Sequence, residues 1–114
     1  MALLLGTWSL TQWMDALNAL LSGSTAVAST PYTMLSTDSL ILVDASSAAV
    51  TVDLIAAAAH GGMPVTIKKT DSSANAVTID GSGSETIDGA TTLVLASQYD
   101  SATIQTNGSE WWIL

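Results

Sequence analysis

The stretch 64–80 reads PVTIKKTDSSANAVTID, and its pattern decides the fold. Residues 65–68 and 77–80 each alternate apolar with polar side chains, as half-buried β-strands do. Between them, residues 71–75 are rich in the residue types that form turns. The Val-Thr-Ile sequence occurs in both segments, and two similar strands on either side of a turn predict a hairpin rather than a true repeat.

The same pattern of short strands and turns continues along most of the chain. Further strands are expected at 40–43, 50–54, 85–88, 93–95, 103–106 and 111–114. Asn107-Gly108 is a tight hairpin signal between the last two of them. This pattern predicts a mainly β fold, an antiparallel β-sandwich or jelly-roll-like domain.

One short amphipathic helix is expected ahead of the strands. Its apolar residues recur at helical spacing within an arc of roughly 120°: Leu10, Trp13, Met14, Leu17, Leu20 and Leu21. Ser9 and Gln12 fit a capping box, and Trp8 with Trp13 fits the accompanying hydrophobic staple. Gly23 is well placed to end the helix.

The chain of 114 residues thus divides into an N-terminal arm, helix and linker (1–31) and a β domain (32–114). Residues 22–31 (SGSTAVASTP) are small and uncharged, as in a flexible connector. A helix of about 13 residues is marginal alone in water, so its apolar face must dock. Two alternatives remain open, docking on its own β domain or holding a partner, in which case residues 8–21 serve as an anchor or oligomerisation element.

The charge composition excludes several functions. The chain has ten acidic residues against two Lys and no Arg, a formal net charge of −8. With only Lys68 and Lys69 to neutralise phosphates, binding to nucleic acid or to an anionic membrane is not expected. Only 11% of residues are charged and 48% are hydrophobic. Because so few ionised groups are available to cover a small domain, we expect apolar surface to be buried against other subunits.

No catalytic group stands out, and no cofactor is implied. His60 is the only histidine and there is no Cys, so Ser–His catalysis would have to depend on this one residue. Because it stands beside Gly61-Gly62 in an expected loop, His60 is interpreted as an exposed loop residue. Asp80, Glu85 and Asp88 cluster in the segment DGSGSETIDG, which fits turn chemistry, since Asp and Gly are common in turns. Calcium binding and a carboxylate pair for glycoside hydrolysis are the less favoured alternatives. No metal site is therefore predicted.

From residue 32 onward the chain resembles a β module of tailed-bacteriophage structural proteins. The matching segments are SLILVD (39–44), VTV (50–52), PVTIKKTDSSANAVTID (64–80), GSETIDG (83–89), Gln98-Tyr99 and NGSEWWIL (107–114). The chain departs from the module at Leu54-Ile55, where a Leu-Pro pair is expected. In such proteins the module ends a fibre or decorates the virion, usually as a trimer, and it carries no catalytic residues.

The resemblance therefore implies a non-enzymatic virion protein. About 30 residues precede the module, which favours a trimeric capsid decoration protein or short head fibre over a long tail fibre. Its partners would be further copies of itself and the major capsid protein, on the capsid exterior. The alternative is a tail-fibre or tail-tip module that binds a host glycan, with Tyr99, Trp111 and Trp112 as possible ligand contacts. Because adjacent strand residues point to opposite faces, at least one of the two Trp is expected in the core.

Overall fold

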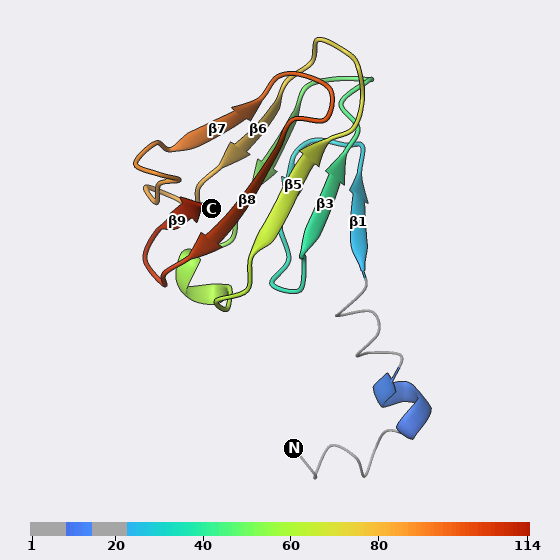
Figure 1. Cartoon of the computed structure of the whole chain (residues 1–114), viewed down its shortest axis with the longest axis vertical. Helices are drawn as coiled ribbons and strands as arrows, with labels where there is room; N and C mark the ends of the chain where they lie inside the picture. The colour runs from blue at the N-terminus through green and yellow to red at the C-terminus, as the bar shows by residue number, and fades with distance from the viewer. Residues whose placement is uncertain (1–8, 15–22) are drawn as a thin grey trace.

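The computed structural model describes residues 9–14 and 23–114 and is mainly β, with a short N-terminal helix and two mixed sheets (Figure 1). The helix covers residues 10–14 within the described range. The strands are β1 (Ser24–Val27), β2 (Tyr32–Thr33), β3 (Leu40–Val43), β4 (Val50–Asp53), β5 (Val65–Lys69), β6 (Val77–Asp80), β7 (Thr92–Leu95), β8 (Ser101–Thr106) and β9 (Trp111–Ile113). A 3-10 turn, η1 (Ala57–Ala59), lies between β4 and β5.

Consecutive strands alternate between the two sheets as far as β6. Sheet A has the order β1-β3-β5-β8-β9, and sheet B has the order β2-β4-β6-β7. The pairs β1–β3, β3–β5, β2–β4 and β4–β6 are parallel. The pairs β5–β8, β6–β7 and β8–β9 are antiparallel. The first six strands therefore form three stacked coils, each with one strand in each sheet.

The expectation of antiparallel pairing throughout is wrong, and so is the hairpin expected over 65–80. The strands β5 and β6 lie in different sheets and do not pair with each other. Alternating apolar and polar residues are typical of any strand with one buried face, whichever direction its neighbours run. Parallel neighbours need a crossover of a dozen or more residues. Here a strand of the opposite sheet forms part of that crossover.

One hydrophobic core is shared by both sheets. Ile41, Val43, Val65, Ile67 and Ile104 of sheet A are fully buried, as are Val52, Val77 and Ile79 of sheet B. Trp111 on β9 is also fully buried, whereas Trp112 is 46% exposed. This confirms that the two tryptophans point to opposite faces. The antiparallel pairing of β8 with β9 around Asn107-Gly108 confirms the last predicted hairpin.

The segment predicted as a flexible connector contains a strand. Residues Ser24–Val27 pair in parallel with Leu40–Val43 along their full length. The β-rich unit therefore begins at Ser24 rather than at Tyr32. Small uncharged residues carried no strand signal, and the neighbouring strand overrides their weak intrinsic preference.

The start of the helix is as the sequence indicates. The backbone N–H of Ser9 donates to Gln12 Oε1 over 2.7 Å, and the N–H of Gln12 donates to Ser9 Oγ over 3.1 Å. These reciprocal bonds confirm the capping box. Trp8, Leu17, Leu20 and Leu21, and the predicted end of the helix, lie outside the described residues.

Lys69 is the last residue of β5, and its side chain points into the core with those of Val65 and Ile67. The side chain is 0% exposed, and Nζ lies 2.7 Å from Asp71 Oδ2. Its neighbour Lys68 points outward, where Nζ donates to the Tyr99 carbonyl and lies 5.5 Å from the Tyr99 ring. The two lysines therefore face opposite sides of β5, and Lys69 is the one paired with a carboxylate.

We predict that Lys69→Ala destabilises the fold by about 3–5 kcal/mol, because it leaves a carboxylate without its cation in a buried position. Lys68→Ala is the matched control, and we expect it to lose at most about 1 kcal/mol. Urea unfolding monitored by Trp fluorescence measures both. Equal losses from the two variants would contradict a structural role specific to Lys69.

Candidate functional site

The loops gather at two ends of the β unit, and each end has its own buried carboxylate. We call the end formed by residues 44–49, 70–76 and 96–100 the upper end. We call the end where Gly23 enters, formed by residues 34–39 and 54–64, the base. In Figure 1 the upper end is at the top, and β1 begins at the base.

At the upper end, Asp71 organises two loops. It accepts hydrogen bonds from the backbone N–H of Ala45 over 2.8 Å and of Ser73 over 3.0 Å, besides Lys69 Nζ and Ser73 Oγ. Asn75 Nδ2 donates to the Ala45 carbonyl over 2.8 Å. The Lys69 ammonium and the Ser73 hydroxyl hold the pKa of Asp71 well below its usual range. These bonds fix the loop that carries the chain from sheet A to sheet B.

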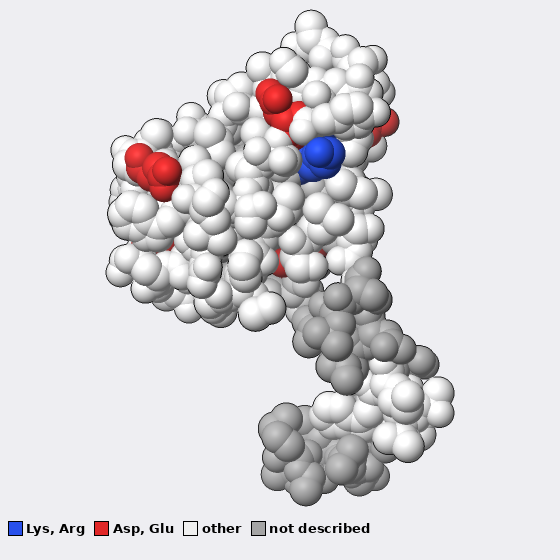
Figure 2. All heavy atoms as spheres, viewed as in Figure 1, with Lys and Arg blue, Asp and Glu red and all other residues white. Residues whose placement is uncertain are grey.

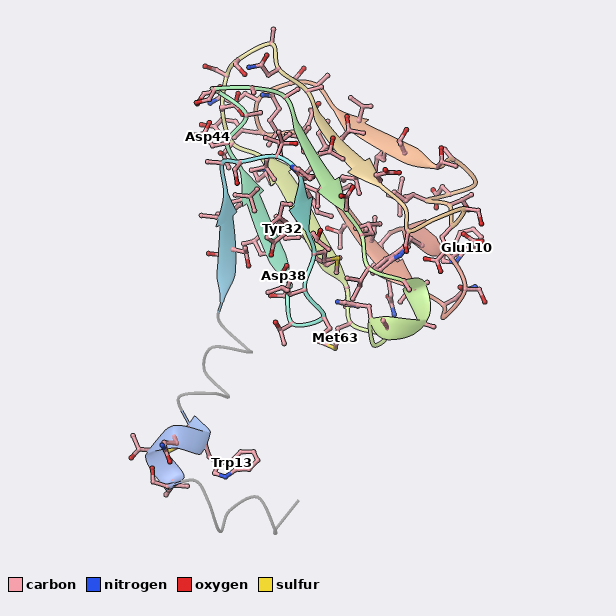
Figure 3. The ribbon with its side chains drawn as sticks, turned by 180° about the vertical axis from the view of Figure 1, so that it is seen from behind. Trp13, Tyr32, Asp38, Asp44, Met63 and Glu110 are labelled. Carbon is pink, nitrogen blue, oxygen red and sulfur yellow. The ribbon has the colours of Figure 1, made fainter. Side chains whose placement is uncertain are left out.

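At the base, Asp38 plays the corresponding part. This carboxylate is 7% exposed and accepts bonds from Thr25 Oγ1 over 2.7 Å, Tyr32 Oη over 2.6 Å and the Leu35 N–H over 2.9 Å. Burial, together with the bond to Asp38, raises the pKa of Tyr32 to about 12. Figure 3 shows Tyr32 and Asp38 side by side on the base half of the unit. The network connects β1, β2 and the loop that leads into β3.

All but two of the described carboxylates accept hydrogen bonds that hold backbone or hydroxyl groups in place. Besides Asp38 and Asp71, these are Asp44, Glu85, Asp88, Asp100 and Glu110. The two exceptions are Asp53 and Asp80, which are partners in the parallel register of β4 and β6. Both lie on the outer, solvent-facing side of sheet B, since their sequence neighbours Val52 and Ile79 point into the core.

The segment DGSGSETIDG is a loop, as turn chemistry predicts, and the strand expected at 85–88 is reduced to isolated bridges. Asp88 and Gly89 both have positive φ, 49° and 85°, at the centre of a tight turn closed by Ile87 and Ala90. Glu85 bonds the Ala57 N–H and Asp88 bonds the Ile113 N–H, so these carboxylates point to different elements. Among the described residues, no group of three or more His, Asp and Glu side chains could hold a metal ion.

The interpretation of His60 as an exposed residue is wrong. The side chain is 6% exposed, and its ring packs on Trp111 with 5.4 Å between centroids. Nδ1 lies 2.9 Å from the Gly61 carbonyl, which only accepts, so Nδ1 is the donor. Nε2 has no hydrogen-bond partner within the described part of the chain. The Gly61-Gly62 pair therefore does not mark an exposed position for His60, which packs into the core.

The three aromatic residues proposed as ligand contacts are not brought together. Trp111 is buried and therefore cannot contact a ligand. Tyr99 is 62% exposed in the upper-end loop before β8, whereas Trp112 pairs with Gln105 toward the other end of that strand. At about 3.4 Å per residue along β8, the two rings cannot flank one small ligand.

Exposed apolar side chains mark the N-terminal helix and the base. Among the predicted anchor residues, Leu10 is 73% and Met14 55% exposed, while Trp13 is half-buried. At the base, Met63 is 70% and Leu35 58% exposed. The sequence pattern missed Leu35 and Met63, because isolated apolar residues in loops follow no period.

The surface between these features is mostly uncharged. In Figure 2 the face shown is largely white, with small red patches and one blue patch. Of the two lysines, only Lys68 reaches solvent, since Lys69 is buried. No helix in the described part of the chain is long and apolar enough to cross a membrane.

No protein-family model matches the sequence, and no curated protein matches it significantly.

We predict that Tyr32 resists ionisation to a pH of about 12, because its neutral phenol is partly buried and donates to Asp38. In Tyr99→Phe, Tyr32 is the one remaining tyrosine, so ultraviolet absorbance at alkaline pH reports it alone. Because the folded pKa is raised, Tyr32 adds to the free energy of unfolding. This contribution is complete below pH 10 and is lost as the pH rises from about 10 to 12. A midpoint near 10 in the folded protein would contradict the Asp38 network.

We also predict that acid weakens the upper end through Asp71. Its folded pKa lies below the ordinary value of 3.8, so its contribution is full above that pH and is lost as the pH falls below it. Asp71→Asn should lower the melting temperature at pH 7, and the gap to wild type should narrow toward pH 2. A gap that stays constant with pH would show that charge at Asp71 contributes nothing.

Proposed function

We propose that this chain is a non-enzymatic structural protein of a tailed-bacteriophage virion, a trimeric capsid decoration protein or short head fibre. In this proposal sheets A and B form a sandwich-like knob on the capsid exterior. The observation that supports it best is the capped N-terminal helix, which presents Leu10 and Met14 to solvent outside the β core. Such side chains on a chain with few charges are expected to be covered by another protein.

The proposed mechanism is burial of this apolar surface against the shell or between protomers. At about 25 cal/mol per Å², a few hundred square ångströms would contribute several kcal/mol per subunit. Three linked subunits would strengthen binding further, since attachment of one raises the effective concentration of the others. The major capsid protein is the proposed partner.

The properties of the knob suit a passive exterior role. Most of its carboxylates are engaged in holding loops, and His60 is packed against Trp111 instead of beside a nucleophile. The two unengaged carboxylates, Asp53 and Asp80, face outward from sheet B. Their charge would repel nucleic acid, which fits the outside of a shell better than its DNA-lined interior.

A second candidate is a tail-tip module that binds a host glycan. Exposed aromatic rings stack on sugars, and Trp112 and Tyr99 are 46% and 62% exposed. The distance between them along β8 makes two separate contacts on an extended polysaccharide the form this binding would take. Trp111 is no longer a candidate contact.

We predict that deleting residues 1–22 leaves a folded β unit that no longer joins virions, because β1 and the core remain while the apolar helix is lost. Circular dichroism measures folding, and incubation with virions that lack the protein, followed by sedimentation, measures binding. Leu10→Ser with Met14→Ser is a milder variant that keeps the chain length. Binding by the deletion protein at wild-type levels would contradict the proposal.

Gold-labelled antibody on intact virions separates the two candidates. Label spread over the head supports decoration. Label confined to the tail contradicts it and favours the glycan-binding candidate. In that case Trp112→Ala should reduce binding to host polysaccharide, while the surface variant Val94→Ala, on sheet B, serves as the control.

A further inference from the structure

Two apolar side chains are held in fixed positions at the base. Leu35 lies in a turn in which its N–H donates to Asp38 Oδ2 and its carbonyl accepts from the Asp38 N–H. Met63 follows Gly62, whose carbonyl accepts a 2.6 Å bond from Gln105 Nε2. Leu35 and Met63 are therefore presented on ordered loops, despite being 58% and 70% exposed. We call this pair the base patch.

The loops that carry the base patch are neighbours. They lead into β3 and β5, which pair in parallel with Leu40 beside Thr66. The Thr66 N–H also donates to the Ser39 carbonyl, so the two loops enter the sheet side by side. Figure 3 shows Met63 and Asp38 at the same end of the β unit. Residues 55–64 contain no charged side chain, and Asp38, the one charged residue of 34–39, is already buried and hydrogen-bonded, so an apolar partner can approach without removing exposed ions from water.

The N-terminal helix is the matching uncovered surface on the same chain. Residues 9–14 (SLTQWM) carry no charge, and Leu10 and Met14 lie one helical turn apart on one face. The chain enters the β unit at the base, where Ser39 Oγ donates to the Gly23 carbonyl. Residues 15–22 can span at most about 30 Å, so the helix stays within reach of this end of its own or an adjoining copy.

Within one chain the helix and the base patch do not cover each other, since all four side chains are more than half exposed. We propose that the helix of one copy packs its Leu10–Met14 face on the Leu35–Met63 base patch of a second copy. Helix and patch are different surfaces, so the contact is heterologous and repeats from copy to copy until the ring closes. This inference rests on the trimer of the proposed function and names the contact that builds it.

The absence of Cys from the sequence permits a direct test by disulfide trapping. Met14→Cys and Met63→Cys proteins are prepared separately, mixed in equal amounts and oxidised. The inference expects the mixed disulfide as the main product, several-fold above either homodimer. Met14→Cys with Val94→Cys is the matched control, because Val94 is similarly exposed, at 53%, on the outer face of sheet B. The melting temperature of each variant establishes that it folds.

Other products would overturn the inference. Mainly Met14→Cys homodimers would show that helices pair with helices, and mainly Met63→Cys homodimers would show that bases meet. A mixed disulfide no more abundant than the control would show random collision. Sedimentation velocity of the unmodified protein and virion binding are measured in parallel. A trimer that decorates virions but gives no mixed disulfide would refute this contact and leave the proposed function standing.

Discussion

The fold depends on carrying the chain across the core at both ends of every coil. Each crossing leaves backbone N–H groups that no neighbouring strand can satisfy, and unsatisfied buried donors are costly. Buried carboxylates meet this requirement, Asp71 at the upper end through Ala45 and Ser73, and Asp38 at the base through Leu35. Lys69 compensates the charge of Asp71 from within the core. Without these bonds the crossing loops would have no fixed path between the sheets.

This use of carboxylates changes the meaning of the acidic composition. A net charge of −8 suggests many free acidic groups, yet most of the described carboxylates, including the exposed Asp44, Asp88 and Asp100, accept hydrogen bonds from the protein itself. These carboxylates hold loops in place. The outward charge of sheet B comes from Asp53 and Asp80, which are partners in the register of β4 and β6. Like charges in that position destabilise a sheet. The Asp53–Asp80 pair therefore does not stabilise the fold. In the proposed function, its negative charge on the outer face of sheet B repels nucleic acid.

Sequence reasoning succeeded where the signal is local. The capping box of Ser9 and Gln12, the positions of most strands, and the opposite faces of Trp111 and Trp112 all depend on spacing within a few residues. It failed where long-range pairing decides. Parallel stacking, strand β1 and the burial of His60 depend on neighbours many residues away, which an alternation pattern does not encode. The base patch was missed for the same reason, since the loops of Leu35 and Met63 are brought to the same end of sheet A by the pairing of β3 with β5.

Because few residues are charged, part of the surface is apolar, and the structure shows where this apolar surface lies. The inward-facing apolar side chains of the two sheets are buried against each other in one core. Among the described residues, the exposed large apolar side chains lie on the helix, at the base, on β7, at Tyr99 in the upper-end loop, and at residues 112–114. Because the N-terminal segment enters the β unit at the base, both main apolar surfaces occur at one end of the molecule. In the single chain both surfaces stay uncovered, since Leu10, Met14, Leu35 and Met63 are each more than half exposed. The proposed contact between copies at that end would cover them with residues the chain already has.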